Sequence, residues 1–254
     1  MGAAFHMPLS TFGTVQTLVD ERLGTVSTGS IIRDLALIKA IINKARSEEL
    51  TNFVPNFPRL KTPKPRNRWL TVREEARLFA AAAPHLKSLI RFAVDTGGRR
   101  GELLGLDWRY VDLDQKRVTF PDTKNGEDRS VRVCKRAEQT LRDLGPKDSG
   151  PVFTFQGKAI KCIKKGFDAA RTRASVEDIR FHDLRHTFAS RLVQGGVLLY
   201  EVMNLTGHKS LEMVQRYAHL APDFQTRAIS VLDDLCHDLV TVEESGNSEK
   251  ALSH

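Results

Sequence analysis

The sequence predicts a mainly α-helical protein with a small antiparallel β-sheet. Apolar residues recur at helical spacing in several stretches, most completely over residues 86–94, where positions i, i+3, i+4, i+7 and i+8 are apolar. Residues 116–120 and 130–133 instead alternate apolar and polar side chains, and Asn125-Gly126 between them is typical of a β-hairpin turn. Helical patterns cover most of the remaining chain, so we expect the sheet to be the minor component.

The first 54 residues are expected to form part of a small helical domain. Residues 15–23 fit a short helix, and apolar residues from Ile31 to Ala45 recur every three or four positions. Thr28 and Ser30 precede this second pattern and can cap its helix.

Residues 55–69 are expected to form an extended, cationic linker. Proline fixes φ and lacks a backbone donor, and four prolines exclude a helix here. Such a segment can lie along phosphate groups, or it can be a solvated basic linker. Its basic residues are Arg59, Lys61, Lys64, Arg66 and Arg68.

A second domain is expected over residues 70–241, followed by a disordered tail over 242–254. Thr71 can cap its first helix. The next helix runs into Gly97-Gly98, whose glycines allow a turn with positive φ. A short helix is expected over 102–106, and the hairpin that follows places Lys124 near its tip.

Further helices are expected after Gly145-Pro146, with one beginning at His182. Gly207 fits a left-handed residue that ends the helix over 198–205. Ser210 can cap the helix that carries Tyr217, which Pro222 would end. A last amphipathic helix is expected over 225–240.

The composition favours a polyanionic partner. The net charge is +8 and the isoelectric point about 9.5, as in many nucleic-acid-binding proteins. The three cysteines form no CxxC pair, which argues against a zinc ribbon or a disulfide framework. No apolar run is long enough for a membrane helix, so we expect a cytoplasmic protein without membrane contacts.

Basic residues and a tyrosine gather late in the sequence. His182 and Arg185 are three apart at a helix start, where both can face one ligand. Gly207-His208 follows, and Tyr217 lies nine residues beyond that histidine. A phenol is a poor nucleophile unless positive charge and proton donors surround it. Tyr217 can equally be a core residue, but this pattern also suits attack on a phosphodiester.

Phosphoryl transfer explains the residue types. Two arginines can bind the non-bridging oxygens through paired hydrogen bonds, and a mobile lysine such as Lys124 can protonate the leaving oxygen. A histidine can accept the tyrosine proton. No metal or other cofactor is needed, because a phosphotyrosine conserves the energy of the broken bond.

Five motifs in this order resemble those of the tyrosine recombinases, or phage integrase family. They are Thr96-Gly-Gly-Arg99-Arg-Gly-Glu102-Leu-Leu-Gly-Leu, Thr123-Lys124-Asn-Gly, His182-Asp-Leu-Arg185-His-Thr-Phe, Gly207-His208 and Tyr217. The resemblance covers about residues 27 to 220. It implies a phosphate clamp of Arg99 and Arg185, proton handling by His182, Lys124 as general acid, His208 as a further donor, and Tyr217 as nucleophile.

The resemblance also implies a partner and an assembly. These are double-stranded DNA with a core-type site, a homotetramer on that DNA, and accessory bending and directionality factors in a bacterial or phage-infected cell. The short N-terminal part and the missing arm-binding domain suggest a fragment that binds core sites weakly. Arg100 is expected to contact the DNA backbone, and Thr206 replaces a usual leucine, which we interpret as a packing variation.

Two other functions stay open at this point. His182 and His186 are one helical turn apart with Asp183 between them, a spacing that also occurs in zinc hydrolases. Arg185 inside the motif would repel a metal, and no third ligand stands out, so we expect His186 to be structural. A DNA-binding regulator with a silent active site is the second alternative.

Overall fold

The computed structural model divides the chain into two compact units, Met1–Arg66 and Asn67–His254, each with its own apolar core. The division falls inside the predicted linker, and the predicted roles of the two domains stay predictions. Lys64, Lys124, the tail and most of the last predicted helix lie outside the described residues. The structure describes residues 11–53, 55–62, 66–121, 128–222, 229–230 and 232–233.

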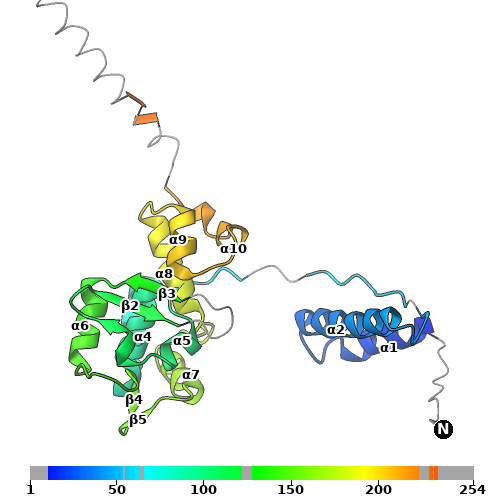
Figure 1. Ribbon diagram of the computed structural model, residues 1–254, viewed down its shortest axis with the longest axis horizontal. Coiled ribbons are helices and arrows are strands. Elements are labelled where there is room, and N and C mark those ends of the chain that lie inside the picture. The colour runs from blue at the N-terminus through cyan, green and yellow to red at the C-terminus, as the bar shows by residue number, and fades with distance from the viewer. Residues whose placement is uncertain are drawn as a thin grey trace, which may run out of the picture. The chain divides into compact units, whose positions relative to one another are not determined.

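The first unit contains a pair of helices, α1 (Thr11–Arg22) and α2 (Thr28–Ser47), which lie side by side in Figure 1. Val19 from α1 and Ile31 from α2 are each 1% exposed, and both belong to one small apolar cluster. Residues 55–62 belong to no helix or strand. The apolar period that predicts α2 therefore corresponds to its buried face.

The N-cap of α2 is Ser27, so the prediction of Thr28 or Ser30 was wrong. Ser27 has an extended backbone, and its hydroxyl accepts a hydrogen bond from Ser30 N at 3.2 Å. Ser30 lies inside the first turn and donates this bond. The cap must be non-helical, and among these residues Ser27 meets that condition.

Helices build most of the second unit, which confirms the predicted fold class. In Figure 1 α4 lies between α6 and α8, and it contacts both of them. No helix in the described part of the chain is long and apolar enough to span a bilayer. Two short 3-10 helices are η1 (Trp108–Tyr110) and η2 (Ala218–Leu220). The α-helices are α3 (Val72–Ala81), α4 (Pro84–Thr96), α5 (Arg100–Leu104), α6 (Lys135–Asp143), α7 (Lys164–Arg173), α8 (Asp183–Gln194), α9 (Leu199–Thr206) and α10 (Glu212–Gln215).

Two small antiparallel sheets accompany the helices. Strands β1, β2 and β3 form one sheet in that order, and β4 pairs with β5. Val118 and Val131 are paired across β2 and β3 and are both buried, as the predicted alternation requires. The other three strands have two residues each, too few to show an alternating pattern. The strands are β1 (Val111–Asp112), β2 (Arg117–Phe120), β3 (Arg129–Arg132), β4 (Thr154–Phe155) and β5 (Lys158–Ala159).

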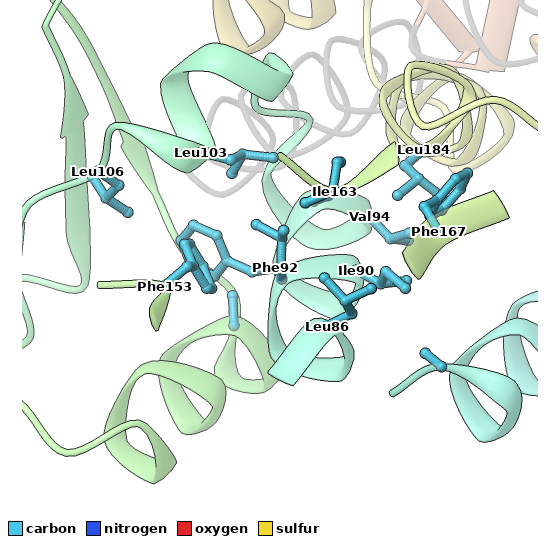
Figure 2. Close-up of a cluster of buried hydrophobic side chains, with 14 of the residues drawn as sticks. Leu86, Ile90, Phe92, Val94, Leu103, Leu106, Phe153, Ile163, Phe167 and Leu184 are labelled. Carbon is cyan, nitrogen blue, oxygen red and sulfur yellow. The ribbon is translucent and has the colours of Figure 1, made fainter. Parts of the chain in front are cut away.

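The main core surrounds α4, as Figure 2 shows. Phe92 of α4 meets Phe153 with ring centroids 5.6 Å apart, and Ile90 is 1% exposed. Phe167 and Leu184 are buried in the same core. This packing fixes the end of α4 and the start of α8, because α4 leads into the turn at Gly97 and Leu184 lies in the first turn of α8.

Local capping signals were predicted correctly around α3 and α4. Thr71 caps α3 in a capping box, since Glu74 N donates to the Thr71 hydroxyl and Thr71 N donates to Glu74. Gly97 ends α4 with φ of 61°. A Cβ there would lie 2.4 Å from a ring carbon of Phe188, so only glycine allows α4 and α8 to approach this closely.

The helix predicted between Ser210 and Pro222 is two short pieces, α10 and η2. The N-cap of α10 is Leu211, so the prediction of Ser210 was wrong. Tyr217 precedes η2, and its N–H donates to Val214 O at 2.9 Å, a bond three residues long. The ring packs into a second apolar cluster with Val214, and this burial accompanies the tighter turn.

Candidate active site

Four segments of the second unit meet at the candidate site. They are the turn after α4, the start of α8, the turn after α9 and the residue before η2. Lys124 lies outside the described residues, so its role stays a prediction. The structure brings together the other five predicted catalytic residues, which are Arg99, His182, Arg185, His208 and Tyr217.

Arg185 is a buried cation at the centre of the site. It is 2% exposed, donates to Gly97 O at 2.8 Å, and faces His208 Nε2 at 3.4 Å. Burial, followed by the positive charges of Arg99 and Arg129, lowers its pKa to about 9. The protein therefore concentrates positive charge here, which favours binding of an anion.

Arg99 connects the turn after α4 with the turn after α9, because its guanidinium donates to Gly207 O. Gly207 has φ of 65°, which confirms the predicted left-handed end of α9. A Cβ on Gly207 would lie 2.6 Å from Arg129 Cδ. Glycine is required both for this backbone conformation and for the close approach of the arginine side chain.

Arg129 and the carboxylate of Glu102 complete the cluster around Arg99, and no catalytic role was predicted for either residue. Glu102 accepts from Arg99 N at 2.8 Å and from both guanidinium groups, while Arg129 also donates to Leu205 O at 2.6 Å. Burial raises the pKa of Glu102, but the Arg129 charge and the Arg99 hydrogen bonds outweigh it, and the pKa falls below its usual range. A glutamate three residues after Arg99 is a recognisable capping signal. Arg129 had no local signal.

Thr206 orients the ring of His208. The threonine hydroxyl donates its one proton to Val202 O at 2.6 Å, and it lies 2.6 Å from His208 Nδ1. His208 Nδ1–H is therefore the donor in the second bond, and Nε2 is left as an acceptor toward Arg185. Thr206 is thus more than the packing variation expected from the sequence.

His208→Asn is expected to make the protein less sensitive to acid. Burial, followed by the charges of Arg185 and Arg99, lowers the pKa of His208 to about 3, from 6.5. Between pH 3 and 6.5 His208 binds a proton in the unfolded chain but not in the folded protein. The free energy of unfolding is therefore highest above pH 6.5 and decreases as the pH falls toward 3. Because the ring is partly exposed, we expect a change of about 1 to 2 kcal/mol in the free energy of unfolding.

Urea unfolding at neutral and mildly acidic pH measures this effect. The loss of stability on acidification should be smaller for His208→Asn than for wild type. His85→Asn is the matched control, because the His85 ring packs against Phe155 with centroids 4.1 Å apart, away from the site. Equal acid-induced losses in His208→Asn and wild type would contradict the prediction.

Tyr217 is buried at 4% exposure, and its hydroxyl is hydrogen-bonded to His186 Nδ1. Burial raises the pKa of the phenol, whereas the positive charges of Arg216 and Arg185 oppose that change. His186 was expected to be structural, and its contact with the predicted nucleophile was not predicted. Position i+4 from His182 was the available signal, but it was interpreted only as a metal spacing.

His182 precedes α8 and is its N-cap residue. Its ring lies 5.0 Å from the His186 ring, centroid to centroid, in an edge-on contact. Desolvation of the ring and the Arg185 charge lower its pKa. His182 therefore contacts His186, the hydrogen-bond partner of Tyr217. Its role in proton handling stays a prediction.

The predicted DNA-contacting residues have different surroundings. Arg100 is exposed at the start of α5. Arg68 binds Glu74 at 2.6 Å and Asp178 at 2.7 Å, so its guanidinium already has two carboxylate partners. Lys64 lies outside the described residues. The three other predicted residues, Arg59, Lys61 and Arg66, lie in the first unit and are exposed.

The histidine pair does not form part of a metal cluster among the described residues, where no three His, Cys, Asp or Glu side chains gather to hold an ion. His186 Nδ1 is directed to the Tyr217 hydroxyl. The pair is better explained by contact with the tyrosine than by metal coordination.

The sequence matches the phage integrase family over residues 68–223. Similar curated proteins include the integrase of Salmonella phage P22, 32% identical over 220 residues, and a shufflon-specific DNA recombinase of Escherichia coli, 35% identical over 210 residues. These alignments cover 79% and 80% of this chain, but 56% and 54% of the two relatives. The chain therefore spans about half the length of these relatives.

Solved structures have a similar fold. The catalytic domain of bacteriophage HP1 integrase is 30% identical with a TM-score of 0.54, over 64% of this chain and 93% of that domain. The Tn1549 transposon integrase, solved with circular intermediate DNA, has a TM-score of 0.68 over 88% of this chain and 86% of its own, at 17% identity. These comparisons confirm the predicted catalytic fold and do not favour the zinc hydrolase or the silent regulator.

Proposed function

The chain belongs to the phage integrase family, and on that premise we propose that it is a site-specific DNA recombinase that cuts and rejoins strands through a 3′-phosphotyrosyl bond on Tyr217. One observation carries the proposal. The Tyr217 hydroxyl contacts His186, and the same site contains two arginines from distant parts of the sequence, Arg99 and Arg185. Nucleophile, proton acceptor and anion-binding groups are the parts that phosphodiester cleavage needs.

The chemistry follows from these groups. Arg99 and Arg185 bind the non-bridging oxygens and stabilise the charge that develops on them during in-line attack. The Tyr217 oxygen forms a bond to phosphorus while the bond from phosphorus to the 5′ oxygen breaks. Lys124, in its predicted role, supplies the proton that the departing 5′ oxygen needs. Attack by a 5′ hydroxyl from another strand reverses these steps and releases Tyr217.

The same proposal includes a DNA partner and an assembly. Exchange between two duplexes breaks four strands, so one nucleophile per subunit requires four subunits on DNA. We therefore propose a homotetramer on a core-type site, with DNA-bending and directionality factors as accessory partners. The cell would be a bacterium or a phage-infected host. The net charge of +8 supports a polyanionic ligand.

Trapping of a covalent complex tests the proposal. A pool of duplexes with a randomised core and a nick just to the 3′ side of the cleavage position loses, after attack, the short fragment that carries the new 5′ hydroxyl, which prevents religation. Wild type is expected to become covalently attached to a subset of the pool, and sequencing of that DNA gives the preferred core. Tyr217→Phe, which keeps the buried ring and removes the hydroxyl, is expected to give no covalent band.

The controls separate the possible outcomes. Noncovalent DNA binding by Tyr217→Phe should remain, since phenylalanine changes no positive charge. Covalent attachment that survives in Tyr217→Phe would contradict the nucleophile assignment. Specific binding by wild type without attachment would instead support the silent DNA-binding regulator.

A further inference from the structure

Among the described residues, His186 is the neighbour of the Tyr217 hydroxyl that is suited to remove its proton. His186 Nδ1 is hydrogen-bonded to this oxygen, and the two rings lie 5.9 Å apart at an angle of 50°. His186 is on the first turn of α8, and Tyr217 follows α10, so the contact joins elements 31 residues apart. The pair is therefore created by tertiary packing and not by a local turn.

The surroundings make proton removal a requirement. Tyr217 is 4% exposed, so bulk water has little access to the phenol. Burial also raises the pKa of the phenol, despite the opposing positive charges of Arg216 and Arg185. A neutral phenol is a weak nucleophile, and the proton must leave as the oxygen attacks.

The other two histidines of the site, His182 and His208, are placed less favourably for removing the tyrosine proton. His208 donates Nδ1–H to Thr206, and its Nε2 faces Arg185. Among the described residues, the His182 ring makes an edge-on contact with His186 and has no hydrogen bond to the phenol. His186 is therefore the histidine in direct contact with the reacting oxygen.

We propose that His186 is the general base for Tyr217, a role that the family resemblance had given to His182. The proton moves from the Tyr217 oxygen to His186 Nδ1 as that oxygen bonds to phosphorus, and the 5′ oxygen leaves with a proton from a separate acid. On religation the imidazolium returns its proton to the released Tyr217. This inference rests on the proposed function, because it assumes that Tyr217 attacks DNA.

A spectroscopic test needs no DNA. The chain has three tyrosines, Tyr110, Tyr200 and Tyr217, so a label at tyrosine Cζ gives three carbon resonances. Tyr217→Phe assigns the third. His186→Ala is expected to move the Tyr217 resonance and leave the other two unchanged, whereas His186→Asn, whose amide lies near the Nδ1 position, should move it less. No change in the Tyr217 resonance in His186→Ala would overturn the inference.

Single-turnover cleavage then separates a base from a positioning residue. The substrate is a duplex recovered from the covalent pool with wild type. Asparagine can hold the phenol but cannot take its proton, so His186→Ala and His186→Asn should both be slower by about 100-fold. Added imidazole should partly restore His186→Ala. A near-wild-type rate for His186→Asn would show that His186 only positions the phenol. A faster rate for His186→Ala would show that the contact holds Tyr217 in an inactive position. Both outcomes contradict the proposal.

A sulfur substitution identifies the side of the reaction on which His186 acts. A 5′-bridging phosphorothiolate has a leaving group that needs no proton. His186→Asn should still cleave this substrate more slowly than wild type. A rate restored to the wild-type value would place His186 on the leaving-group side and overturn the proposal. His85→Asn should cleave like wild type. Absence of attachment by wild type would contradict the proposed function, while the tyrosine resonances would still report the contact.

Discussion

Arg185→Met is expected to stabilise the second unit and abolish DNA cleavage. Arg185 is 2% exposed and has Arg99 and Arg129 near it, while Glu102 is the carboxylate that most opposes their effect on its pKa. The low pKa, about 9, shows that folding disfavours the charged form. Methionine fills a similar volume without charge, and replacement of buried charged groups by apolar ones is often stabilising by about 1 to 4 kcal/mol.

One lost contact limits the gain. Gly97 O accepts a hydrogen bond from the Arg185 guanidinium at 2.8 Å. Arg185→Met leaves this carbonyl, in the packed turn after α4, without that donor. Such a loss costs about 1 to 3 kcal/mol. We therefore expect a net gain near 1 kcal/mol, which corresponds to about 2 to 4 °C in the melting temperature.

The catalytic loss should be far larger. Removal of a single oxyanion donor costs about 10² to 10³ in rate, and Arg185 presents several donors to one phosphate. We expect a fall of at least about 10³ in the rate of covalent attachment. Calorimetry and single-turnover cleavage of the same preparation measure the two effects together.

Sulfate provides a control, because an anion that binds the folded site should raise the melting temperature of wild type more than that of Arg185→Met. A variant that is both inactive and strongly destabilised would contradict this interpretation. It would mean that the hydrogen bond to Gly97 contributes more to the free energy of unfolding than burial of the Arg185 charge costs. Retained cleavage would contradict its role as a phosphate ligand.

The fold could be predicted where local pattern and packing agree. The apolar period over residues 86–94 predicts α4 because all five positions of its stripe are buried. Gly97 and Gly207 marked helix ends because both have positive φ. Prediction failed where packing overrides local preference: Tyr217 was placed on a helix of several turns, but its ring is buried before a 3-10 turn.

The site was predictable as a set of residue types and only partly as a set of contacts. Motif spacing selected Arg99 and Arg185, yet their connection through Gly97 and Gly207 depends on turns that meet in space. His186 was expected to be structural, with metal coordination as the alternative, because its partner lies 31 residues away and gives no local signal. Arg129 was missed for the same reason, since it contacts α5 and the end of α9 from a strand.

Glu102→Gln is expected to destabilise the second unit and to impair cleavage, the reverse of the stability effect at Arg185. Glu102 accepts hydrogen bonds from Arg99 and Arg129, and its side chain is 14% exposed. The Arg129 side chain is 11% exposed, so loss of the carboxylate leaves a largely buried cation without its counterion. Breaking a buried pair in this way costs about 3 to 5 kcal/mol, and partial exposure places our expectation near 3 kcal/mol.

Arg129→Met in the same chain tests the cause. If the cost arises from an uncompensated guanidinium, the double variant Glu102→Gln with Arg129→Met should regain about 2 kcal/mol relative to Glu102→Gln alone. Cleavage should not recover, because Arg99 still lacks the carboxylate that orients it toward the phosphate. Additive losses of stability would show that the two side chains do not act as a pair. Recovery of cleavage would show that Arg99 holds its position without Glu102, and that the carboxylate serves only to neutralise Arg129.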